Sequence, residues 1–235
     1  MQRVVEPEIL DQLAPDDPRA LRARRDLRRV NALMFQDLIV ARALMKYCTT
    51  QPRLFVDLGS GDGTFMLKVA RRLSKRWRNV ELVIVDQADA VAGETRAAFA
   101  ALGWKVNVEV ANVFDFMSRT RRPDIDVMTA NMFLHHFPEP DLVSLLAKIA
   151  PVTPLFIVGE LRRTRFVREA GRNMWLLGGG DVICYDGRVS ARAAFIGKEL
   201  SALWPKVGGW RLHERAVGPW THLFVAQREN KAIAQ

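Results

Sequence analysis

The stretch Phe55-Val56-Asp57-Leu58-Gly59-Ser60-Gly61-Asp62-Gly63-Thr64 decides the fold. An apolar run containing an acid is followed by three glycines at alternate positions, and then by a run with helical spacing. Glycines at such a junction let the backbone turn tightly and approach a bound molecule, while the first turn of the helix offers free N–H groups. The stretch therefore predicts a strand, a ligand-binding turn and a helix in succession.

The alternation of strand and helix continues downstream. Further strands are expected at 80–85, 106–111, 125–130 and 155–158, after a first strand at 53–58, with helices at 64–73, 88–102 and 138–149. Short strands alternating with helices of this length indicate βαβ units, and hence a parallel sheet with helices on both faces.

Both ends of the chain add to this sheet. Residues 17–47 carry the pattern of two helices, 162–177 and 190–204 that of one helix each, and two strands at 210–217 and 221–227 flank a Gly-Pro turn. We therefore expect an α/β fold with a Rossmann-like, mostly parallel sheet of seven strands. An antiparallel hairpin closes the sheet, with helices before the first strand and after the fifth.

Composition bounds the function classes. The 235 residues are 49% hydrophobic, and no apolar stretch approaches the ~20 residues that span a bilayer. The first ten residues lack an apolar signal core, and the two cysteines lie far apart, so we expect a cytoplasmic protein with reduced thiols. The net charge of +9 comes largely from clusters at 19–29, 71–78 and 119–122, which we interpret as solvated helix faces rather than an RNA-binding surface.

A second acid strengthens the interpretation of the glycine turn. Asp86 ends the next predicted strand, 23 residues beyond Gly63, where an open sheet places a carboxylate beside a bound ribose. A dinucleotide-binding domain would show G-x-G-x-x-G, but Thr64 occupies the position of the third glycine.

The segment resembles the first motif of class I S-adenosyl-L-methionine (SAM)-dependent methyltransferases, which is an acid, any residue, then G-x-G-x-G. The resemblance covers residues 53–160 and implies SAM as cofactor and S-adenosyl-L-homocysteine as product. It implies that Asp86 and Gln87 lie at the ribose and that the methionine end lies along Asp57, Gly59, Ser60, Gly61 and Gly63. Asn112 and Val113 stand where the family often places an acid near the adenine; the Asn112 carbonyl oxygen can still accept that bond, and Asp115 is the alternative.

Residues 130–137, Ala-Asn-Met-Phe-Leu-His-His-Phe, look like the LHHF segment of small-molecule methyltransferases. The resemblance implies that Asn131 lies near the sulfonium and that His135 and His136 face the acceptor. Histidine is suited to removing the proton of a phenol, so either is a candidate base; the alternative is that each only caps a helix or packs.

Other polar residues have structural interpretations. Glu160, at the end of the fifth strand, could orient a substrate, but we favour an ion pair with Arg162 or Arg163. His213 and His222 are expected to face solvent. No metal ligand set is expected.

The acceptor class follows from absences and from one resemblance. The run after the fourth strand lacks the Asn/Asp-Pro-Pro-aromatic pattern of base-amine methylases, and neither cysteine lies there, which favours a small acceptor. Residues 175–205 resemble the tail of bacterial methyltransferases that accompany type III polyketide synthases, which implies O-methylation of a phenolic or polyketide-like compound. An RNA or protein methyltransferase and a SAM-binding subunit without activity stay open, as does a homodimer.

We expect residues 1–50 to cover the acceptor site and 51–235 to form the SAM-binding domain, with 161–205 as a helical cap.

Overall fold

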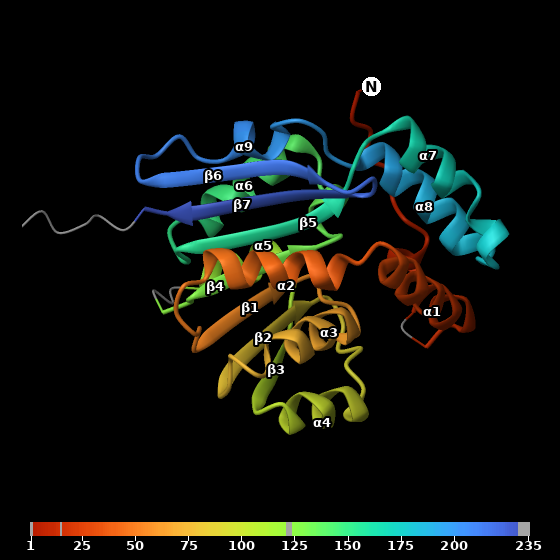
Figure 1. The fold of residues 1–235 in the computed structure, drawn as a ribbon. Coiled ribbons are helices and arrows are strands. Elements are labelled where there is room, and N and C mark those ends of the chain that lie inside the picture. The colour runs from red at the N-terminus through yellow and green to blue at the C-terminus, as the bar shows by residue number, and fades with distance from the viewer. Residues whose placement is uncertain (1, 15, 121–123, 230–235) are drawn as a thin grey trace, which may run out of the picture.

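The computed structural model describes residues 2–14, 16–120 and 124–229 (Figure 1). Seven strands form one sheet in the order β3-β2-β1-β4-β5-β7-β6. They are β1 (Leu54–Leu58), β2 (Val80–Asp86), β3 (Trp104–Val110), β4 (Val127–Asn131), β5 (Leu155–Leu161), β6 (Trp210–Val217) and β7 (Thr221–Arg228). The first five run parallel, and β7 pairs antiparallel with both β5 and β6. The predicted fold class is confirmed.

Helices cover both faces of the sheet. Those of the core are α2 (Gln36–Tyr47), α3 (Thr64–Leu73), α4 (Gly93–Ala101), α5 (Val113–Arg119), α6 (Glu139–Ile149) and α9 (Glu199–Leu203). Strand side chains alternate between two apolar cores: Phe55 packs with residues of α2 and α3, whereas Val56 packs with residues of α5 and α6.

Three more helices gather beyond the carboxyl ends of the parallel strands, next to the N-terminus (Figure 1). They are α1 (Pro18–Leu33), α7 (Arg165–Arg172) and α8 (Asp181–Ala193). Short 3-10 turns precede α1 (Leu10–Gln12), follow β4 (Leu134–His136) and connect α7 to α8 (Met174–Leu177). Asp17 accepts a bond from Arg19 N at 2.7 Å and Pro18 opens α1, as its sequence predicts. In the described part of the chain, no helix has the length and apolar character needed to cross a bilayer.

The predicted helix at 190–204 is wrong in its bounds. Helix α8 begins earlier, at Asp181, and ends at Ala193, and α9 is a separate helix. The break arises because Phe195 pairs its backbone with the end of β5: its N–H donates to Leu161 O at 3.2 Å and its carbonyl accepts from Arg163 N at 2.9 Å. The expected helix at 162–177 is likewise divided, into α7 and a 3-10 turn.

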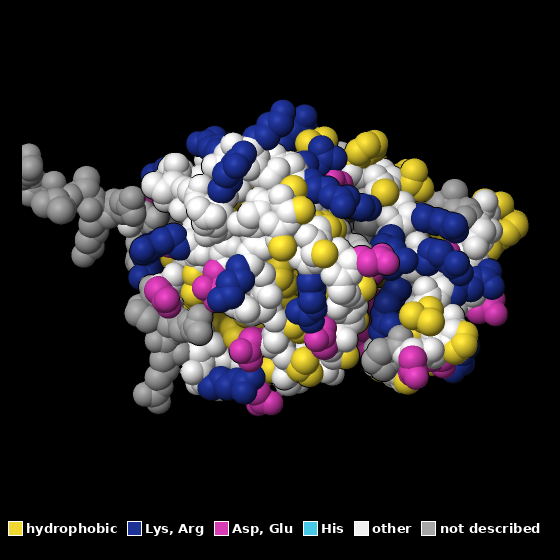
Figure 2. Space-filling model, turned by 90° about the horizontal axis from the view of Figure 1, so that it is seen from below, with side chains coloured by type: hydrophobic (Ala, Val, Ile, Leu, Met, Phe, Trp, Pro, Cys, Tyr) yellow, Lys and Arg dark blue, Asp and Glu magenta, His cyan; other side chains and the backbone are white. Residues whose placement is uncertain are grey.

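Basic side chains are spread over the face seen in Figure 2, with acidic ones between them, and lie closest together on the lobe at the right. Some basic side chains of the chain form ion pairs: Arg28 lies 2.6 Å from Asp62, and Arg96 lies 2.6 Å from Asp89. Arg121 and Arg122 of the third predicted cluster lie outside the described residues.

The cap helices α7 and α8 touch at two glycines. A Cβ added to Gly171 would lie 2.5 Å from the carbonyl oxygen of Gly187, a contact that side chains do not tolerate. The close approach of the two helices therefore requires glycine at position 171.

We expect Gly171→Ala to lower the free energy of unfolding by about 1–3 kcal/mol, because overpacking forces the helices apart. Thermal unfolding followed by circular dichroism measures this effect. Gly93→Ala is the matched control, since a Cβ there meets nothing within 4 Å. Equal melting temperatures for both variants would contradict the packing role.

Candidate active site

Asp57, the acid of the glycine motif, is buried beneath the turn and hydrogen-bonded to it. Asp57 is 2% exposed and accepts hydrogen bonds from the hydroxyls of Ser60 and Thr129, which tie the end of β1 to the turn and to β4. Burial raises the pKa of Asp57 to about 6, although both hydrogen bonds oppose the shift.

The turn itself, residues 59–63, is called the glycine elbow below. Gly59, Gly61 and Gly63 all have positive φ, at 67°, 57° and 71°, which glycine adopts without strain. A Cβ on Gly61 would meet nothing within 4 Å, so the elbow is open there, whereas one on Gly59 would lie 2.1 Å from Cδ2 of Phe133. The elbow therefore offers open backbone at Gly61 and is covered by an aromatic ring at Gly59.

Asp86, the residue predicted to bind the ribose, lies at the elbow. Asp86 ends β2 and accepts a hydrogen bond from Gly61 N at 2.8 Å through one carboxylate oxygen. Gln87 beside it is exposed. Asp57 and Asp86, the two acids expected to flank the cofactor, therefore both bond residues of the glycine elbow.

The predicted adenine residues lie at the end of β3. Asn112 is the N-cap of α5, and its Oδ1 accepts from Phe114 N at 2.8 Å. Val113 is buried behind it, and Asp115 is exposed in the first turn. One lone pair of Asn112 Oδ1 is used by the cap, which leaves the second for a ligand.

Two buried amide oxygens beside Gly159 of β5 lack hydrogen-bond partners among the described residues. Asn131 Oδ1 and Gln36 Oε1 accept no hydrogen bond from the described residues, and both converge on Gly159, 2.7 and 3.0 Å from the site of its missing Cβ. A buried acceptor without a donor costs about 1–3 kcal/mol, so a bound donor or cation would satisfy this pair. SAM carries a positive ammonium and sulfonium, and the residues present fit it. Gln36 was missed by the sequence analysis, because nothing local distinguishes it from other residues at the start of a helix.

Glu160 organises the turn that follows β4. It is fully buried and accepts from Phe133 N at 2.9 Å, Leu134 N at 2.6 Å and His135 Nδ1 at 2.7 Å. The expected ion pair with Arg162 or Arg163 is wrong. Both arginines lie past the strand end, where Arg162 donates to Gly218 O and Arg163 pairs with Glu199.

The two candidate histidines stack, with ring centroids 4.3 Å apart, but differ in environment. His135 is 3% exposed, and its Nε2 lies 3.3 Å from Oε1 of Glu8. Burial opposes charge on this ring, but Glu160 and Glu8 outweigh it and raise the pKa of His135 to about 10. His136 is more exposed and pairs with Asp11 at 3.1 Å.

Neither of the remaining histidines is placed as predicted. His222 is 2% exposed and pairs with Glu214 at 2.7 Å, because β7 lies inside the sheet between β5 and β6. His213 is half-buried against Tyr47, with ring centroids 5.1 Å apart.

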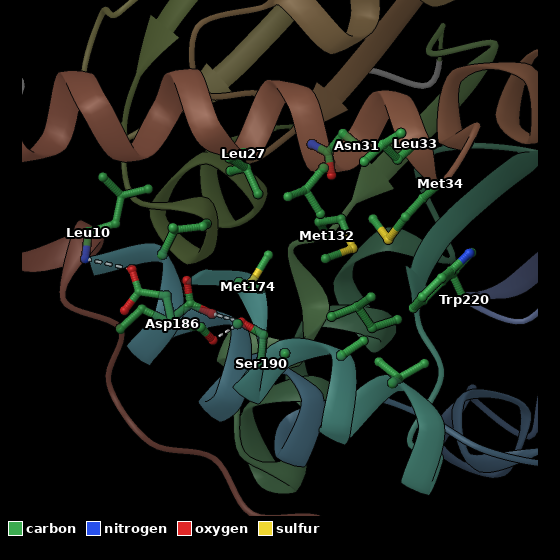
Figure 3. Close-up of a pocket in the computed structure, with 18 residues that line it drawn as sticks. Leu10, Leu27, Asn31, Leu33, Met34, Met132, Met174, Asp186, Ser190 and Trp220 are labelled. Atoms are coloured by element: carbon green, nitrogen blue, oxygen red, sulfur yellow. Dashed lines mark hydrogen bonds between the residues drawn. The ribbon is translucent and has the colours of Figure 1, made fainter. Parts of the chain in front are cut away.

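A large cavity adjoins this turn (Figure 3). It encloses about 840 Å³ including the space at its open mouth, and its walls come from α1, α7 and α8. The lining is mostly apolar, with Leu27, Leu33, Met34, Met132, Met174 and Trp220 among its members. Polar groups lie at Asn31 on one wall and at Asp186 and Ser190 on another (Figure 3).

The chain is similar to known methyltransferases in sequence and in fold. A family model described as a methyltransferase domain matches residues 55–154. An O-methyltransferase family protein from Burkholderia thailandensis is 18% identical with a TM-score of 0.63, and the alignment covers 92% of this chain and 61% of that one. This chain thus spans less than two thirds of that relative.

A second similar structure is the plantazolicin methyltransferase BpumL in complex with S-adenosyl-L-homocysteine (SAH), 14% identical with a TM-score of 0.63 over 91% of this chain and 92% of that chain. BpumL in complex with SAH and a monoazolic desmethyl-plantazolicin analogue gives 14% identity and a TM-score of 0.59 over 91% of each chain. At these identities the likeness shows the fold. No curated protein matches the chain.

The strand order, the acid-and-glycine elbow and the matched domain agree with one another. Residues 55–154 match a methyltransferase domain, and the chain shares the fold of a methyltransferase whose structures contain SAH.

Proposed function

We propose that this protein is a class I SAM-dependent methyltransferase that methylates an oxygen atom of a small phenolic or polyketide-like acceptor held in the cavity of Figure 3. The observation that carries the proposal is the lining of the cavity, which is mostly apolar with a few polar groups, as is usual for small-molecule sites. In this proposal residues 1–50 and the cap at 161–205 form the acceptor site, since α1 supplies one wall and α7 and α8 the other.

The cavity lies beside the cofactor site. Met132 lines it and directly follows Asn131, one of the residues proposed to contact SAM. Asn31 lines both this cavity and a smaller pocket shared with Thr64 and Phe65 at the start of α3. An acceptor in the cavity would therefore approach the cofactor past Met132 and Asn31.

The cofactor contacts stay as the sequence proposes them. SAM supplies an electrophilic methyl group, and the residues that would hold it are Asp57, Gly59, Ser60, Gly61, Gly63, Asp86, Gln87, Asn112, Val113 and Asn131, to which Gln36 is added. The chain's own task is to align the acceptor oxygen with that methyl carbon at about 3–3.5 Å, a contribution of proximity. We also propose that His135 and His136 serve the removal of the acceptor's proton.

The acceptor class is tested by SAH release from the purified enzyme with a panel of alkylphenols, a structured RNA and a peptide mixture. We expect turnover with phenols that carry an apolar body, and a product whose new methyl group is on oxygen by NMR. Methylation of the RNA or peptides alone, or SAM binding without turnover on any acceptor, would contradict the proposal.

We expect Asp86→Ala to weaken SAM binding by about 1–3 kcal/mol in isothermal titration, because the ribose hydroxyls lose their acceptor. Asp89→Ala is the matched control on the same turn, since Asp89 is exposed and pairs with Arg96. Unchanged affinity for Asp86→Ala would show that the cofactor lies in another register.

The histidine variants should differ. We expect His135→Ala to lose most turnover with SAM affinity kept, because His135 bonds two buried carboxylates, and His136→Ala to lose less. Steady-state rates and isothermal titration are compared for both variants after their folding is verified by thermal melting. Full turnover in both would remove the histidines from proton transfer.

A further inference from the structure

The first residues of the chain form a strap across the end of the sheet. Residues 3–10, called the N-terminal strap, are bound along their length. Arg3 donates to the carbonyls of His135, Phe137 and Ala193 at 3.1, 2.8 and 2.7 Å. The strap is thus fixed between the turn after β4 and helix α8.

The far end of the strap is bound by one carboxylate of α8. Asp186 is 3% exposed and accepts from Ile9 N at 2.7 Å and Leu10 N at 3.1 Å. Both of its oxygens are used in this way, so Asp186 serves to position the strap. Figure 3 shows the bond to Leu10 at the edge of the cavity.

Glu8 lies between these two attachments and lines the cavity. Its Oε1 accepts from the Ser190 hydroxyl and lies 3.3 Å from His135 Nε2. Its Oε2 has no hydrogen-bond partner among the described residues, although the side chain is only 12% exposed. A carboxylate oxygen is therefore available at the wall of a mostly apolar cavity.

Glu8 is also held in its charged form. Burial would raise its pKa, but the hydrogen bond and charge of His135 lower the pKa of Glu8 to about 2. His135 itself does not line the cavity, and it is bonded to Glu160 on its other side. Glu8 thus stands between the cavity and the histidine.

We propose that Glu8, delivered by the N-terminal strap, contacts the acceptor's hydroxyl through Oε2 and takes its proton. The inference rests on the proposed O-methylation. As the acceptor oxygen bonds to the methyl carbon, the carbon–sulfur bond breaks and its electron pair stays on sulfur. The O–H electron pair stays on oxygen, and the proton moves to Glu8 Oε2 and then to water on product release.

A weakly basic carboxylate suffices for this step. The acceptor oxygen becomes positively charged as the methyl group is transferred, so its proton becomes strongly acidic during the reaction. Proton removal then follows bond formation closely, and a charged, well-placed oxygen matters more than a high pKa. His135 is a positioning residue in this scheme, because it holds the Glu8 carboxylate in place and lowers its pKa.

The test compares Glu8→Gln with Glu6→Gln. Both residues are on the strap, but Glu6 pairs with Arg192 at 2.7 Å and does not line the cavity. We expect Glu8→Gln to lower kcat on the order of 10²-fold, the usual contribution of a general base, with KM for SAM and the melting temperature unchanged. Glu8→Asp, which keeps the charge, should recover part of the rate, and Glu6→Gln should resemble the wild type.

Three outcomes would overturn the proposal. A wild-type kcat in Glu8→Gln would show that Glu8 takes no proton, while the proposed function would stand if the wild type methylates phenols. A wild type inactive on every oxygen acceptor would overturn both. Donor atoms of Glu8, His135 and His136 lie within 4.8 Å of one another, a spacing that could admit a divalent cation. Dialysis against EDTA should leave turnover unchanged; loss that Zn²⁺ restores would replace the base with a metal ion.

Discussion

A buried carboxylate at the end of β5 is the constraint on which the turn after β4 and the neighbouring cavity wall depend. Glu160 has no contact with solvent, and a charge in that position is costly unless it is paired and hydrogen-bonded. Two backbone N–H groups and the ring of His135 provide those bonds. The turn after β4 therefore has one conformation that satisfies the charge, and the placement of Phe133, Leu134 and His135 follows from it.

The position of Glu8 in the cavity wall depends on the same charge. His135 bonds Glu160 through one ring nitrogen and faces Glu8 with the other. The position of the Glu160 carboxylate therefore determines where the N-terminal strap can place the Glu8 carboxylate. Arg3 fixes the strap to the carbonyls of the same turn. Segments that are more than 100 residues apart in sequence thus form one site around a chain of alternating charges.

The sequence predicted what is encoded locally. The spacing of apolar residues predicted the sheet, and the three glycines predicted the elbow, because both patterns depend on residues that are neighbours in sequence. Glu8 and Gln36 were missed, since their roles arise only where the N-terminal region crosses the sheet edge. The partner of Glu160 was mistaken for the same reason: sequence proximity favoured an arginine two residues away, whereas the histidine lies 25 residues away in sequence and 2.7 Å away in space.

The turn after β4 also contains backbone strain that the same bonds retain. Met132 has a φ of 52°, in the left-handed region that costs a non-glycine residue about 1–2 kcal/mol. Its N–H donates to Gly159 O at 2.8 Å, and the next two N–H groups bond Glu160, so β5 holds three successive donors. Strain of this kind persists where the surroundings over-determine it. Asn131, one residue before the strained position, points its Oδ1 toward Gly159, whereas Met132 lines the cavity, so that one residue step separates the interior of the sheet edge from the cavity wall.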